Sequence, residues 1–112
     1  MRGSMLSLID DHLPVYFSDD VTILNIDKAY LELSAALMQE KPVILDISGV
    51  TETDLTFVQL IESARRRAAA SGRDLVLSRP AEGAVLEVLR RGGFLDDDVC
   101  NRAEFWLQEG FQ

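Results

Sequence analysis

The stretch Val43-Ile44-Leu45-Asp46-Ile47-Ser48-Gly49 decides the fold class of this chain. Four of its first five side chains are large and apolar, which is typical of a buried strand covered on both faces. We therefore predict a strand that ends at Gly49. A loop should follow, and then a long helix that starts at Asp54-Leu55-Thr56.

The helix after this strand has the clearest pattern in the chain. Apolar residues recur at steps of three and four and define a buried stripe: Phe57, Leu60, Ile61, Ala64 and Ala68. Gly72 follows the stripe, where a left-handed residue commonly ends a helix. The opposite face of an ideal helix carries Leu55, Gln59, Glu62 and Arg66. Leu55 is thus expected to be an apolar residue on an exposed polar face.

A second strand–helix unit follows, and a short helix closes the chain. Leu75–Ser78 has the composition of another central strand, and residues 81–91 form a helical pattern that Gly92-Gly93 ends. Residues 101–109 are expected to form a last helix that carries Phe105-Trp106-Leu107. We interpret this aromatic segment as a lid over the core, with a dimer contact as the alternative.

The N-terminal part suggests a hairpin followed by a helix. Leu13–Phe17 and Val21–Ile26 have strand composition, and Ser18-Asp19-Asp20 between them supplies turn-forming side chains. A helix is expected from Lys28 to about Glu40, before Pro42.

Strands that alternate with helices imply parallel pairing through right-handed crossovers. We therefore predict an α/β fold with a mixed, mainly parallel sheet of four to five strands, an N-terminal hairpin and about four flanking helices. Residues 5–112 are expected to form one domain, because 112 residues suffice for a single core. Residues 1–4 resemble an expression-vector remnant.

The net charge of −8 argues against nucleic acid or an anionic membrane as partner, because both require a basic surface. Membrane insertion is not expected either, since no apolar run approaches the roughly 20 residues of a membrane span. Cys100 is the single cysteine, which excludes an internal disulfide and favours a reducing cytoplasm.

No arrangement of catalytic residues, metal ligands or cofactor-binding loops emerges from the sequence. His12 is the sole histidine and has no recognisable nucleophile partner. Asp46 lies where phosphoryl-accepting receiver domains hold an aspartate, but Lys28 and Lys41 both precede it and the late lysine of a receiver is missing. We expect Asp46 to bond the backbone of a loop at residues 49–53 instead, and we expect no enzyme activity.

Residues 12–95 resemble a STAS domain, the anti-anti-sigma fold of bacterial regulatory switches. The resemblance rests on VILDISGVTETD at residues 43–54, the helix after it, and GRDLVLSRPAEGAVLEVLRRGGF at residues 72–94. It implies a non-catalytic module that docks on a protein partner. Such a partner would be a serine/threonine kinase, an anti-sigma factor or a chemosensory kinase.

The resemblance also implies a site for regulation. Phosphorylated STAS domains commonly show Asp-Ser-Ser/Thr-Gly-Leu, and the corresponding residues here are Asp54, Leu55, Thr56, Phe57 and Val58. Thr56 occupies the acceptor position. Residues 51–62 would form the docking surface, with six partner-binding candidates: Glu52, Thr53, Asp54, Leu55, Gln59 and Glu62.

Three functional alternatives remain open at this point. The chain could be an anti-sigma factor antagonist released by phosphorylation of Thr56. It could instead be a permanent STAS subunit of a chemosensory or lipid-transport complex, in which Thr56 and its neighbours only cap a helix. A small-ligand carrier is the third alternative, and a homodimer is compatible with all of them.

Overall fold

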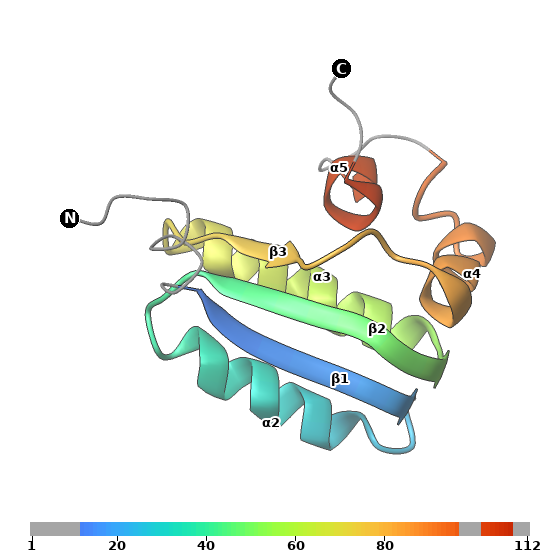
Figure 1. Ribbon diagram of the computed structural model, residues 1–112, viewed down its shortest axis with the longest axis horizontal. Helices are drawn as coiled ribbons and strands as arrows, with labels where there is room; N and C mark the ends of the chain where they lie inside the picture. Colours follow the sequence, from blue (N-terminus) through green and yellow to red (C-terminus); the bar gives the residue numbers. More distant parts are fainter. Residues whose placement is uncertain (1–11, 97–101, 109–112) are drawn as a thin grey trace.

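The computed structural model describes residues 12–96 and 102–108. Strands and helices alternate along these residues (Figure 1). The elements are β1 (Leu13–Val21), α2 (Ile26–Leu37), β2 (Val43–Thr53), α3 (Leu55–Ala70), β3 (Leu75–Leu77), α4 (Gly83–Arg91) and α5 (Arg102–Leu107). The α/β class and the four flanking helices agree with the sequence prediction.

The sheet has the order β1-β2-β3, and both pairings are parallel. Val43 at the start of β2 lies opposite Leu13 on one side and Leu75 on the other. The crossover helices α2 and α3 bury the alternate side chains of the strands, which include Val15, Leu45 and Leu77. Phe17 of β1 meets Phe57 of α3 edge to face, with ring centroids 5.3 Å apart.

The predicted N-terminal hairpin is wrong. Ser18-Asp19-Asp20 does not turn the chain, because these residues pair in parallel with β2 inside one continuous β1. Two register shifts and the positive φ of 61° at Asp19 take up the irregularity, and aspartate tolerates such a backbone better than most residues. Within the described residues the sheet therefore has three strands, not four to five.

β2 does not end at Gly49. The strand continues to Thr53, so that Asp54 alone separates it from α3. A Cβ atom at Gly49 would lie 3.1 Å from the Cβ of Ser18 in β1. Glycine at this position thus allows the two strands to approach each other and does not mark the end of one of them.

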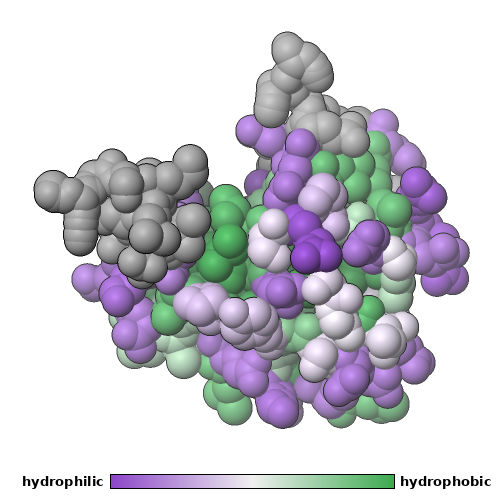
Figure 2. Space-filling model, in the orientation of Figure 1, coloured by the Kyte–Doolittle hydropathy of each residue, from purple (hydrophilic) through white to green (hydrophobic). Residues whose placement is uncertain are grey.

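The prediction that the central strand is covered on both faces is also wrong. Ile44 and Asp46 are half-buried, whereas Val43, Leu45 and Ile47 are buried. In Figure 1, α3 lies behind the sheet, and the near face of β1 and β2 has no described helix over it. Figure 2 shows apolar side chains among polar ones on this face.

The helix ends agree with the sequence more closely. The buried stripe of α3 is confirmed except at Leu60, which is half-buried. Gly72 has φ +74°, and Arg73 N–H donates to the Ala68 carbonyl at 2.8 Å, which completes a left-handed cap. α2 begins two residues before the predicted Lys28 and ends three before Glu40. Residues 1–4 and Cys100 lie outside the described residues.

Candidate functional site

Asp54 connects two segments at the carboxyl end of the sheet. One carboxylate oxygen accepts the Thr56 N–H at 3.0 Å and so caps α3, as the sequence predicts. The other oxygen accepts the Ile23 N–H at 2.9 Å, from the turn that follows β1. One side chain therefore holds the start of α3 and the turn 22–25 in a fixed arrangement.

The turn at residues 22–25 is ordered by its own hydrogen bonds. The Asn25 side-chain oxygen accepts the Thr22 N–H at 2.8 Å, and the Asn25 amide group donates to the Asp20 carbonyl at 3.0 Å. Such bonds are typical of turns built on asparagine. The turn exposes 64% of Ile23 and 93% of Leu24. Two apolar side chains are thus held in solvent by a well-bonded backbone.

Leu55 lies on the other side of Asp54, at the start of α3. It is 39% exposed and lines a cavity of about 310 Å³ with Val88 and Gly92 of the α4 end. A Cβ atom at Gly92 would lie 3.1 Å from a methyl carbon of Leu55. Leu55 is therefore partly exposed, as expected, and α4 shields part of it. We call Ile23, Leu24 and Leu55 the apolar cluster.

Thr56 lies in the first turn of α3 and is half-buried. Within the described residues its hydroxyl makes no hydrogen bond, although its N–H is bonded to Asp54. The hydroxyl of Thr53 differs, since it donates to the Val21 carbonyl at 2.8 Å and so joins the ends of β1 and β2. Of these two candidates, Thr56 has the hydroxyl that is available for other chemistry.

Glu62 corrects the helical-wheel prediction. The residue is not on an exposed face but only 4% exposed, because α5 covers this side of α3. Its carboxylate accepts Trp106 Nε1–H at 2.7 Å and Arg65 Nη2 at 3.1 Å, and Arg102 Nε lies 3.8 Å away. Glu62 is therefore not accessible to a partner while α5 is docked.

The remaining candidates lie where the sequence places them. Glu52 and Gln59 are exposed, and Glu52 lies at the end of β2 close to Asp54. Ile23 and Leu24 are not among the residues predicted from the sequence, because residues 21–26 have the composition of a strand. The sequence signal for a turn was the pair Thr22 and Asn25, because threonine and asparagine side chains commonly bond the backbone of turns.

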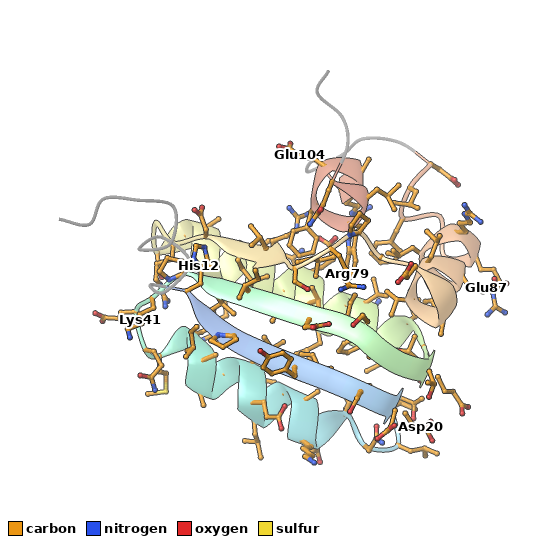
Figure 3. All side chains as sticks on the ribbon, in the orientation of Figure 1. His12, Asp20, Lys41, Arg79, Glu87 and Glu104 are labelled. Carbon is orange, nitrogen blue, oxygen red and sulfur yellow. The ribbon has the colours of Figure 1, made fainter. Side chains whose placement is uncertain are left out.

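The described residues contain no group of three or more His, Cys, Asp or Glu side chains that could hold a metal ion. Asp46 binds its own strand and not residues 49–53: it accepts the Ser48 hydroxyl at 2.7 Å and the Ser48 N–H at 3.0 Å. These bonds, the hydroxyl first, hold the pKa of Asp46 below its ordinary value of 3.8. Arg79, labelled in Figure 3, adds a smaller effect in the same direction.

None of the described helices is both long and apolar enough to cross a membrane.

Comparisons with known proteins agree with this fold. No curated protein matches the chain. A solved structure described as a crystal structure analysis of Mglu is similar, with a TM-score of 0.56 and 18% identity. The match covers 65% of this chain and 18% of that one, so this chain spans under a fifth of its length and the likeness shows the fold alone. The family model described as "Mlab, STAS domain" matches residues 10–99, and the chain therefore belongs to the STAS domain family.

Proposed function

We propose that this chain is a non-catalytic regulatory module that docks on a protein partner through the carboxyl end of its sheet. The observation that carries the proposal is the turn at residues 22–25, which holds Leu24 at 93% exposure beside the capped start of α3. Exposed apolar side chains within a polar rim are typical of protein interfaces. Membership of the STAS family supports an interaction role.

The charge around the apolar cluster defines the kind of partner. Asp20, Glu52 and Asp54 lie around the cluster, at the carboxyl ends of β1 and β2. A partner surface with apolar pockets and basic residues at its rim would complement this arrangement. We infer a kinase or an anti-sigma factor with such a surface.

Phosphorylation of Thr56 would control docking. The phosphate would lie at the start of a 16-residue helix, where the helix dipole favours an anion. It would add roughly −1.5 to −2 charges between Leu55 and the acidic rim. The apolar pocket of the partner would have to close over this charge, and the cost of burying it would exceed its attraction to the basic rim, so the complex would dissociate without unfolding of the module.

Quantitative pull-downs from a lysate of the native host test the proposal. Thr56→Glu should lower recovery of the partner at least about tenfold, whereas Thr56→Ala should retain it. Ser71→Glu is the control, because Ser71 is exposed at the opposite end of α3 and the substitution adds the same charge. Leu24→Asp should abolish recovery if the cluster is the interface.

The outcome at Thr56 separates regulation from docking. Loss of binding in Leu24→Asp but not in Thr56→Glu, with no phosphate found at residue 56, would leave a docking module without a switch. Full binding by Leu24→Asp would contradict the whole proposal.

A permanent subunit of a larger complex is the second candidate, and Phe57 favours it. Phosphorylated relatives have glycine at this position, but here Phe57 is fully buried and packs against Phe17. Phe57 is thus part of the hydrophobic core, and it lies directly after the acceptor position Thr56. A partner from a chemosensory or lipid-transport complex, recovered equally by wild type and Thr56→Glu, would support this candidate over the switch.

A further inference from the structure

The outer side of α2 carries a second apolar surface. Leu31 is 65% exposed, and Met38 at the C-cap of the helix, seven residues later, is 77% exposed. Residues seven apart lie on the same side of a helix. We call Leu31 and Met38 the α2 ridge.

The side of α2 that faces α3 widens this surface. Tyr30 is 53% exposed and lines a shallow cleft with Ser34 of α2 and with Ser63 and Arg67 of α3. The ridge and the cleft thus form one continuous two-helix face. Its centre is apolar, and hydroxyl groups lie along the cleft.

The two ends of this face carry opposite charges. The helices α2 and α3 both begin at the carboxyl end of the sheet, where the exposed acidic residues Asp20, Asp27 and Glu52 outnumber the exposed Lys28. Both end at the other side of the molecule, where the exposed basic residues Lys41, Arg66 and Arg67 outnumber the exposed Glu40. Figure 3 shows Asp20 and Lys41 at these opposite ends.

We propose that the two-helix face is a self-association surface, on which a second copy of this chain packs antiparallel across the α2 ridge. A two-fold axis brings the acidic end of each copy to the basic end of the other, so every attraction occurs twice. The helix dipoles of the two copies also oppose each other, which is favourable. A parallel arrangement would place like charges together at both ends.

A dimer across this face would also approach Leu24 of the apolar cluster, because the turn 22–25 lies directly before α2. Self-association and partner docking would therefore compete. Leu31 and Met38 lie outside the cluster, so substitutions there test the dimer without changing the residues of the proposed partner site.

Sedimentation equilibrium of the full chain, from about 5 to 500 µM, tests the proposal. We expect a concentration-dependent dimer that Leu31→Glu with Met38→Glu weakens at least about tenfold. Circular dichroism should show an unchanged fold, because both side chains are mostly exposed. Tyr16→Glu, on the opposite face of the sheet and 68% exposed, is the control and should dimerise like wild type.

A charge reversal identifies the antiparallel geometry. One variant carries Arg66→Glu and Arg67→Glu, and the other carries Asp27→Lys and Glu52→Lys. Each variant alone should dimerise at least about tenfold more weakly, since it has like charges at both contacts. An equimolar mixture should restore association to within about threefold of wild type.

Three results would overturn the proposal. The first is a monomer at every concentration, and the second is a dimer that Tyr16→Glu disrupts but the ridge variant does not. The third is a charge-reversed mixture that associates no better than its components. A monomer whose partner recovery falls in Leu31→Glu would instead assign the ridge to a different protein.

Discussion

Asp54 and Glu62 are two carboxylates of the same segment, eight residues apart, and the structure gives them opposite roles. Asp54 is half-buried and holds an exposed turn against the start of α3. Glu62 is buried and holds α5 against the middle of the same helix. Both make several hydrogen bonds, so the number of bonds does not distinguish them. The two carboxylates differ in what they hold in place: Asp54 holds a solvent-exposed turn, and Glu62 holds a helix that covers the core.

The largest effect is expected from Glu62→Ala. The substitution leaves Trp106 Nε1–H, Arg65 and Arg102 without their shared acceptor in a buried site, which should cost about 3–5 kcal/mol of unfolding free energy. Glu62→Gln keeps an acceptor for Trp106 and should cost less, about 1–3 kcal/mol. Urea unfolding followed by the fluorescence of Trp106, the single tryptophan, measures both. A loss below about 1 kcal/mol in Glu62→Ala would show that α5 does not depend on this carboxylate.

Asp54→Ala should have an intermediate effect on stability and a local effect on the turn. Loss of the cap of α3 should cost about 1–2 kcal/mol. The Ile23 N–H also loses its acceptor, so its hydrogen exchange should accelerate relative to amides of β2. Asp54→Asn retains one acceptor oxygen and serves as the control. Unchanged exchange at Ile23 would mean that the turn holds its shape without Asp54.

The comparison also shows what local patterns can and cannot predict. The stripe of α3, its cap at Asp54 and its end at Gly72 depend on neighbours within a few residues, and the sequence predicts them with the single exception of Leu60 in the stripe. The burial of Glu62 depends on Trp106, which lies 44 residues away, so a helical wheel places Glu62 in solvent. The continuity of β1 through Asp19 depends on pairing with β2, and turn-forming residue types alone suggest a hairpin.

Leu24→Asp should leave stability within about 0.5 kcal/mol of wild type, in contrast to both carboxylate variants. The reason is its 93% exposure, which leaves little apolar contact to lose on substitution. Leu33→Ala is the buried control. Leu33 is only 1% exposed in α2, so the substitution should cost about 2–5 kcal/mol of unfolding free energy. Urea unfolding measures both variants. A clearly destabilised Leu24→Asp would indicate that the turn packs against the domain and is not a free anchor.

Asp46 is a third carboxylate and is expected to contribute the least of the three to stability. The Ser48 bonds lower its pKa in the folded state, so its contribution is present above the unfolded value of 3.8 and is lost as pH falls through the lower folded value. The side chain is half-buried and solvent screens it, so Asp46→Asn should cost at most about 1 kcal/mol at neutral pH. Urea midpoints of wild type and Asp46→Asn should therefore converge as pH falls below 3.8. Ser48→Ala removes the hydroxyl bond, which has the larger effect on the pKa of Asp46, and should reproduce most of the stability difference between wild type and Asp46→Asn. A difference that stays constant across this pH range would assign the effect to packing and not to the charge of Asp46.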